Sequence, residues 1–261
     1  LGDVYKRQMQ QRKLKIYFTS DVHGYFYPTT YGDMTEKNVG LFGCAGNFKK
    51  DEDTLILDGG DILQGSAFAY YCRQVADSPE AIADIMNDCG YDYYTLGNHD
   101  FNYGLEYQAA YRSRNNGVCV CQNITDEAGN TLFPWKLHTM KNGLRVGIVG
   151  IVTDYVNIWE KEENLKGIHI TDPFEAAKNA LAQMKEQTDL TICIYHGGFE
   201  CDLESGAVLS KTTENVGYRI CKELDFDILL TGHQHMSVPG RDISGTYTVQ
   251  PCLLYTSDAA D

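Results

Sequence analysis

The sequence contains no long hydrophobic run, and this absence excludes a membrane-spanning helix. No stretch of the 261 residues approaches the ~18 consecutive apolar residues that a span requires. The chain also has no internal repeat and no low-complexity linker, so we expect one domain. Hydrophobic residues make up 43% of the composition, which is enough to form one large core.

Positive charge is also scarce. The chain has 22 Lys and Arg residues against 36 Asp and Glu, and its formal net charge is −14. Such an acidic surface repels the phosphate backbone of a nucleic acid, so polymeric nucleic acids are excluded as substrates. Bound divalent cations would reverse the potential locally and attract a small phosphate ester, which we expect to be the partner of this chain. The oligomeric state is left open.

The nine cysteines lack the spacing of a metal or redox motif. There is no Cys-x-x-Cys pair and no zinc-finger pattern, and several cysteines lie inside apolar segments. We interpret them as reduced core residues. Cys119 and Cys121 are expected on the same face of one strand.

The two ends of the chain have sequences unlike the segments beside them. Residues 1–8 (LGDVYKRQ) precede Met9, and residues 252–261 (CLLYTSDAAD) do not continue the pattern before them. We interpret both as foreign, adapter-derived segments and expect the domain to occupy residues 9–251. If Met9 is the start, no room remains for a signal peptide, which predicts a cytoplasmic protein.

Strand and helix patterns alternate along the chain, which predicts an α/β fold with a site along one rim of a sheet. Apolar, β-branched and aromatic runs predict strands, and helical spacing or capping residues predict helices. The expected strands are 13–19, 54–57, 91–96, 118–122, 132–140, 144–152, 190–195 and 227–230. The expected helices are 40–50, 80–89, 105–115, 215–224 and one that starts at 172–173.

Five short polar clusters follow directly after expected strands. They contain imidazoles, carboxylates and one amide, which are ligands for divalent ions of borderline hardness. Taken alone, each cluster is more often an ordinary turn or a structural residue, but five in the same context favour a metal site. The clusters are Asp21-Val22-His23, Gly60-Asp61, Gly97-Asn98-His99-Asp100, Tyr195-His196-Gly197-Gly198 and Gly232-His233-Gln234-His235.

The spacing within the clusters indicates how they could act together. Asp21 and His23 are two residues apart, so on an extended backbone their side chains would point the same way, and His233 and His235 repeat this spacing. Asp61 has two carboxylate oxygens and could bridge two ions. Two ions bridged ~3.5–4 Å apart can activate a shared water for attack on phosphorus. The remaining histidines, His138 and His169, are expected to be structural or exposed.

This series of motifs resembles the calcineurin-like metallophosphoesterases over residues 13–250. The resemblance implies a four-layer αββα sandwich of two mixed sheets and two divalent ions, which could be Mn, Zn, Fe or Co. It implies that one ion is held by Asp21, His23, Asp61 and His235, and that the other is held by Asp61, Asn98, His196 and His233. It further implies that His99 faces the leaving group, and that Asn98 and His99 contact the substrate.

Longer motifs narrow the resemblance to one group within this family. Residues 60–66, 97–104 and 214–218 resemble the group of 5′-nucleotidases and 2′,3′-cyclic-nucleotide phosphodiesterase/3′-nucleotidases. In the 5′-nucleotidase branch an Asp stands three residues after the catalytic His and orients it, whereas this chain has Asn102 there. We therefore assign His99 and Asn102 as the catalytic pair and favour the cyclic phosphodiesterase branch. Members carry a C-terminal domain that binds the base, and the chain stops before it.

The resulting prediction is a metal-dependent hydrolase of nucleotide phosphoesters, similar to the 2′,3′-cyclic-nucleotide phosphodiesterase/3′-nucleotidases. An alternative within the same chemistry is a 5′-nucleotidase or a nucleotide-sugar hydrolase. A second alternative, from another class, is a metal-binding fragment that does not turn over substrate. The presence of every expected ligand favours catalysis over the inert binder.

Overall fold

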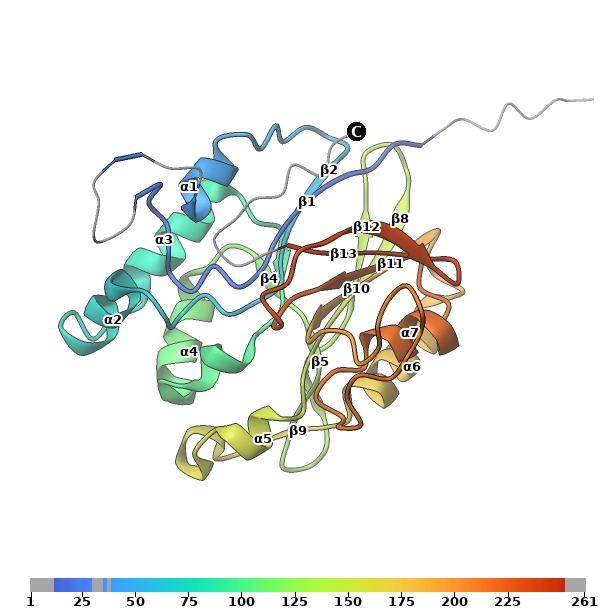
Figure 1. Ribbon diagram of the computed structural model, residues 1–261. Coiled ribbons are helices and arrows are strands. Elements are labelled where there is room, and N and C mark those ends of the chain that lie inside the picture. The colour runs from blue at the N-terminus through green and yellow to red at the C-terminus, as the bar shows by residue number, and fades with distance from the viewer. Residues whose placement is uncertain (1–11, 30–34, 37–38, 252–261) are drawn as a thin grey trace, which may run out of the picture.

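The computed structural model describes residues 12–29, 35–36 and 39–251 of the chain. The interpretations of residues 1–8, Met9 and 252–261 therefore lie outside the described residues. Two sheets lie in the middle of the molecule, with helices on both outer sides (Figure 1).

The first sheet contains four parallel strands in chain order. Its central strand reads TLILD and is buried along its whole length, as expected for a parallel strand covered on both faces. Leu55 and Leu57 face the second sheet, and Ile56 faces the helices on the other side. The strands are β1 (Lys15–Thr19), β2 (Thr54–Asp58), β3 (Tyr93–Tyr94) and β4 (Val118–Cys119).

The second sheet is mixed and contains six strands in the order β12-β13-β11-β10-β8-β7. Its centre is parallel, and the antiparallel pairs β7–β8 and β12–β13 form its two edges. The expected hairpin between β7 and β8 is confirmed. The strands are β7 (Lys136–Thr139), β8 (Arg145–Val152), β10 (Leu190–His196), β11 (Ile228–Thr231), β12 (Val238–Ile243) and β13 (Thr246–Gln250).

A small antiparallel sheet, in the order β6-β5-β9, accounts for two wrong strand predictions. Residues 118–122 are not one strand: the chain leaves the first sheet at Val120, and Cys119 and Cys121 belong to different strands. Residues 132–140 are divided at Pro134, which has no N–H for a sheet ladder. The small sheet consists of β5 (Cys121–Asp126), β6 (Thr131–Phe133) and β9 (Ile168–Ile170).

Helices α1 to α4 cover the outer side of the first sheet, and α6 and α7 cover the outer side of the second (Figure 1). As the sequence predicts, α3 ends at Gly90 in a left-handed conformation, and the Asp172 side chain caps the start of α6. None of the helices in the described ranges has the length and apolar character to cross a membrane. The helices are α1 (Gly40–Ala45), α2 (Ala67–Gln74), α3 (Glu80–Cys89), α4 (Gly104–Arg114), α5 (Val156–Trp159), α6 (Pro173–Met184) and α7 (Gly217–Glu223), with 3₁₀ turns η1 (Asn98–Phe101) and η2 (Glu162–Leu165).

Three apolar layers hold this arrangement together. One lies between the two sheets, where Leu55 and Leu57 of β2 meet Ile192 and Ile194 of β10. The other two lie between each sheet and its own helices. Because the strands of the first sheet and β8, β10 and β11 of the second are parallel, their carboxyl ends deliver the polar clusters to the same rim.

Candidate metal centre

The turns after the strands bend sharply, and the expected extended backbone at the ligand positions is wrong. Asp21, His23, Asp61, His233 and His235 have φ angles of 57°, 52°, 60°, 71° and 52°. These are left-handed conformations, which cost L-residues ~1–2 kcal/mol each. Strained backbone of this kind is concentrated at functional sites. The sharp turns direct the side chains back over the strand ends, which an extended backbone would not do.

One group of ligand atoms gathers around His235. Its Nε2 atom lies 3.1 Å from Nε2 of His23 and 3.4 Å from Oδ1 of Asp21. Nε2 of His23 is also 3.7 Å from Oδ2 of Asp61. Asp21, His23 and His235 each offer one ligand atom within 4.8 Å of the others, as a metal site requires. These four residues are the first predicted ligand set.

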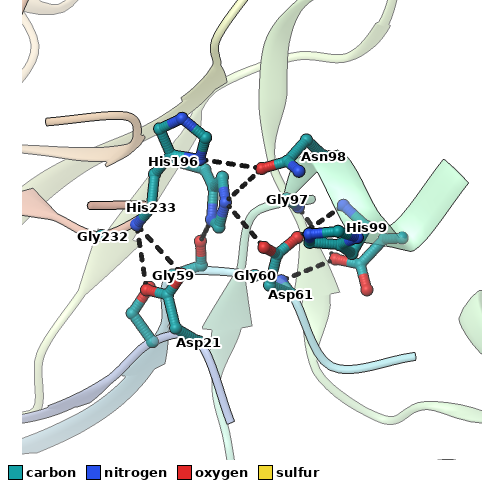
Figure 2. A network of polar contacts seen from close by, with 12 residues as sticks. Asp21, Gly59, Gly60, Asp61, Gly97, Asn98, His99, His196, Gly232 and His233 are labelled. Carbon is teal, nitrogen blue, oxygen red and sulfur yellow. Dashed lines mark hydrogen bonds and ion pairs between the residues drawn. The ribbon is translucent and has the colours of Figure 1, made fainter. Parts of the chain in front are cut away.

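A second group gathers around the amide oxygen of Asn98 (Figure 2). This Oδ1 atom lies 2.9 Å from Nδ1 of His233 and 3.1 Å from Nε2 of His196. The same Nε2 of His196 is 3.2 Å from Oδ2 of Asp61, so Asp61 lies between the two groups. The structure thus brings all seven predicted ligand residues together from five strand ends of two different sheets.

Backbone carbonyls fix which ring nitrogens face the centre. Nδ1 of His23 lies 2.8 Å from the carbonyl oxygen of Gln64, and Nδ1 of His196 lies 2.6 Å from that of Gly59. A carbonyl can only accept, so each Nδ1 carries the proton and donates it. The Nε2 lone pairs are then directed into the centre, which is the arrangement in which a histidine binds a metal.

His233 is held in the opposite orientation. Its Nε2 donates to Oε1 of Glu214 at 3.1 Å, so its Nδ1 faces Asn98. The ring of Trp159 stacks on His233 with centroids 5.5 Å apart and an interplanar angle of 29°. Glu214 begins the motif at residues 214–218, but the spacing of that motif did not indicate a contact with His233. Nothing in the sequence around Trp159 indicated its position.

The electrostatics of the centre demand positive charge. Asp21 and Asp61 are buried, and His196 is fully buried between them. Burial alone would lower the pKa of His196, but the charges of Asp61 and Asp21 raise it to about 10. Burial likewise opposes ionisation of Asp61, yet the neighbouring His196 and His23 hold its pKa below the usual range. Protons or divalent cations can supply this charge, so the donor set fits the predicted metals.

The Asp100 carboxylate organises the backbone of the centre and does not reach into it. It accepts N–H groups from Asp61, Ile62, Leu63 and Gly97 at 2.8–3.0 Å. Gly97 must remain glycine, because a Cβ atom there would lie 2.2 Å from Oδ1 of Asp61. Asp100 belongs to a predicted cluster, but its direction toward the backbone could not be read from the sequence.

The predicted catalytic pair is adjacent to the ligand groups. Nδ1 of His99 lies 2.7 Å from Oδ1 of Asn102, and the backbone N–H of His99 donates to Oδ1 of Asp61 at 2.7 Å. The ring of His99 also meets the ring of His23 edge-on at 5.2 Å. His99 is therefore held beside the centre by its backbone and its side chain.

A cleft of about 630 Å³ opens beside His99 and His233. This volume lies in the range of small-molecule sites, ~300–1,000 Å³. The ring of Trp159, 48% exposed, forms part of its wall. The lining residues are Asn98, His99, Asn102, Val156, Trp159, Glu160, Glu214, Asn215, His233, Gln234 and Met236.

Within residues 12–29, 35–36 and 39–251, the remaining histidines and the cysteines lie outside the ligand set, as predicted. His138 contacts the hydroxyl of Tyr93, and His169 is exposed on β9. Cys121 and Cys193 are buried free thiols whose pKa burial raises to about 12 or beyond, as for inert core cysteines.

A pair of packed sheets between helices, with His, Asp and Asn donors gathered at the strand ends, defines a metallo-dependent phosphatase fold. The chain belongs to the calcineurin-like phosphoesterase family, whose model matches residues 14–237. The predicted family and fold class are therefore confirmed. The expectation of two mixed sheets differs in one detail, because the described strands of the first sheet are all parallel and only the second sheet is mixed.

Three similar proteins illustrate the relationship. The trifunctional nucleotide phosphoesterase YfkN of Bacillus subtilis is 29% identical over 90% of this chain and 17% of its own length. A 2′,3′-cyclic-nucleotide 2′-phosphodiesterase/3′-nucleotidase of Yersinia enterocolitica is 27% identical over 88% of this chain and 38% of its own. The structure of a candidate 5′-nucleotidase from Staphylococcus aureus superposes with a TM-score of 0.84 at 33% identity, covering 91% of this chain and 48% of that one. The chain thus spans less than half the length of each.

Proposed function

We propose that this chain hydrolyses phosphate esters of nucleotides with the help of two divalent ions. The observation that carries the proposal is the convergence of seven ligand residues beside a cleft that also contains His99. The names of the related nucleotidases and phosphodiesterases support a nucleotide substrate.

The ions would be held as the family resemblance implies, with Asp61 shared. Asp21, His23 and His235 would complete the ligand set of one ion. The ligand set of the other ion would be completed by Asn98, His196 and His233. When bound, such ions lower the pKa of a water and offset charge on the phosphoryl oxygens. Nitrogen and oxygen ligands suit Mn, Zn, Fe or Co.

The reaction also needs a proton for the leaving oxygen. Water oxygen forms a new bond to phosphorus as the bond from phosphorus to the ester oxygen breaks. In its doubly protonated form, His99 can donate the Nε2 proton to that ester oxygen and retain the Nδ1 proton, which is directed at Asn102. The cleft beside His99 would contain the alcohol part of the ester, and the exposed face of Trp159 offers a surface for a nucleobase.

Among nucleotide esters, we favour 2′,3′-cyclic nucleotides and 3′-nucleotides. Asn102 replaces the Asp that orients the catalytic His in 5′-nucleotidases, and the Yersinia relative has the cyclic phosphodiesterase name. A neutral amide stabilises a protonated imidazole less than a carboxylate does. We therefore expect this site to prefer other ester bonds than a site with a His–Asp pair.

The test is a substrate panel with the ions controlled. The protein is stripped with a chelator, reloaded with Mn²⁺ and assayed with 2′,3′-cyclic AMP, 3′-AMP, 5′-AMP, a nucleotide sugar and bis(p-nitrophenyl) phosphate. We expect ion-dependent turnover, fastest with the cyclic and 3′ substrates. Asp61→Asn should lose one bound ion and at least 100-fold in rate, because a shared ligand is weakened at both positions.

Three results would contradict parts of the proposal. Full ion binding without turnover of any substrate would assign the chain to the inert binders. Faster turnover of 5′-AMP or the nucleotide sugar would leave the hydrolase assignment intact and show that the favoured substrate is wrong. An Asp61→Asn variant with both ions and full activity would refute the shared ligand.

A further inference from the structure

A chain of hydrogen bonds extends from His99 away from the metal centre to η2. Oδ1 of Asn102 faces Nδ1 of His99 at 2.7 Å, and Nδ2 of Asn102 donates to Oε2 of Glu160 at 2.7 Å. Glu160 follows α5 and is separated from Asn102 by 58 positions. It lines the same cleft as His99.

Glu160 accepts three hydrogen bonds from surrounding donors. Besides Asn102, the backbone N–H of Lys161 and the Nδ2 of Asn164 donate to its Oε1 at 2.7 and 2.9 Å. Asn164 also donates to the carbonyl of Asn102 at 3.2 Å. Residues 160–164 are thus joined to Asn102 by two hydrogen bonds. A carboxylate accepts at both oxygens, whereas Gln would present an NH₂ group on one side, so this set of donors selects Glu over Gln.

The carboxylate decides how the Asn102 amide is turned. An amide can present either its oxygen or its NH₂ group to a neighbour. Because Glu160 can only accept, the NH₂ group of Asn102 must face Glu160, and the oxygen must face His99. Nδ1 of His99 must then carry a proton, and Nε2 faces the cleft.

We infer that Glu160 is a positioning residue that sets the ring orientation and tautomer of His99 through Asn102. An Asp at position 102 would place a negative charge directly against His99. Glu160 supplies that charge from behind the Asn102 side chain. The donor direction thus holds the ring with Nε2 facing the cleft, where a proton on Nε2 would reach a leaving oxygen. This inference rests on the proposed function for its catalytic meaning, whereas the orientation of the ring is independent of it.

The first experiment measures the tautomer of the His99 ring directly. Long-range ¹H–¹⁵N NMR of the whole chain assigns the His99 ring, which we expect in the Nδ1–H form when neutral. Glu160→Gln should convert it to a mixture of tautomers, because Gln presents an NH₂ group to at least one of the three donors. An unchanged His99 spectrum in Glu160→Gln would overturn the inference, whatever the activity of the protein.

The second experiment reads catalysis. General acids contribute ~10²–10⁴-fold to rate, so losing part of this effect in Glu160→Gln should lower kcat for 2′,3′-cyclic AMP roughly tenfold, with KM and bound Mn²⁺ unchanged. Bis(p-nitrophenyl) phosphate has a good leaving group that needs little protonation, so its kcat should fall less than about threefold. Equal losses for both substrates would indicate a general structural effect and refute the positioning role.

Two further variants complete the design. Glu162→Gln, an exposed neighbour on η2, is the matched control and should leave both kcat values unchanged. Asn102→Asp alone places two carboxylates against each other, whereas Asn102→Asp combined with Glu160→Gln restores a donor facing an acceptor. We expect the double variant to be faster than Asn102→Asp alone; a slower double variant would contradict the relay. Absence of turnover in the unaltered chain would refute the proposed function and leave the NMR result to decide this inference.

Discussion

At the scale of single residues, Asp58 is a fully buried carboxyl group behind the metal centre. Thr19 Oγ1 donates to its Oδ1 at 3.0 Å, and the N–H of Gly60 donates to its Oδ2 at 3.1 Å. The hydroxyl of Thr19 also contacts that of Tyr91 at 2.7 Å. Burial raises the pKa of Asp58 to about 8: the hydrogen bonds from Gly60 and Thr19 lower it, the nearby carboxylates of Asp100 and Asp21 raise it by smaller amounts, and the effect of burial is the largest.

This raised pKa predicts a pH-dependent loss of stability. The folded state keeps the Asp58 proton up to about pH 8, whereas the unfolded chain releases it near pH ~3.9. Between these values the folded state binds more protons, so Asp58 makes the free energy of unfolding fall as pH rises, by at most ~1.4 kcal/mol per pH unit. Asp58→Asn cannot ionise, so it should be increasingly more stable than the unaltered chain from pH 5 to 8.

Urea unfolding in the presence of a chelator, repeated across this pH range, measures the effect. Asp225→Asn, which changes a carboxylate with 90% of its side chain exposed, is the control and should follow the unaltered chain. Parallel curves for Asp58→Asn and the unaltered chain would show that Asp58 does not retain its proton.

At the scale of elements, the turns after β1, β2 and β11 are the units that make the centre. They place five ligand residues in left-handed backbone, where glycine would have no strain. The sequence has His or Asp at these positions, so the ligands are kept at a cost in stability. Strain of this kind is typical of positions selected for function.

The cost can be measured at His235, whose φ angle is 52°. In chelator, His235→Gly should be more stable than His235→Ala by ~1 kcal/mol, since only glycine relieves the left-handed strain. For a domain of this size the difference corresponds to roughly 2–4 °C in Tm. His169, which is exposed in the extended strand β9, should show the opposite order. The same order at both positions would contradict the strain.

Element types and the residues that gather at the centre could be predicted from the sequence, because hydrophobic period and motif spacing are local signals. The boundaries of α3 and α6 followed from Gly90 and Asp172, whereas β4 and β5 were merged because nothing local indicates that the chain changes sheets at Val120. The contacts of Glu160 and Trp159 could not be predicted. They depend on segments that meet only after the two sheets pack together.

At the scale of the whole molecule, the centre joins the two sheets. Asp21, Asp61 and Asn98 follow strands of the first sheet, and His196 and His233 belong to the second. The apolar layer packs the two sheets against each other, and these residues add a polar connection between the sheets at the rim. Bound ions should therefore stabilise the packing of one sheet on the other.

Removal of the ions should lower Tm. Ligand at 100 times its Kd stabilises a protein by ~2.7 kcal/mol, which for a domain of this size is roughly 5–10 °C. We expect a decrease of this size when EDTA replaces Mn²⁺ in a thermal scan, and faster hydrogen exchange in residues 20–24 and 232–235. Asp61→Asn is the control and should show a smaller decrease. Identical melting curves with and without Mn²⁺ would argue that the ions do not connect the sheets.

The distribution of the ligands along the chain has a consequence for biosynthesis. The first predicted ligand is Asp21 and the last is His235, so a nascent polypeptide presents an incomplete set of donors until residue 235 has been synthesised. High-affinity capture of metal must then wait until the distant segments have docked. Metal acquisition would act as a checkpoint for the assembly of this domain, and a misfolded product would be recognisable by its failure to retain cations.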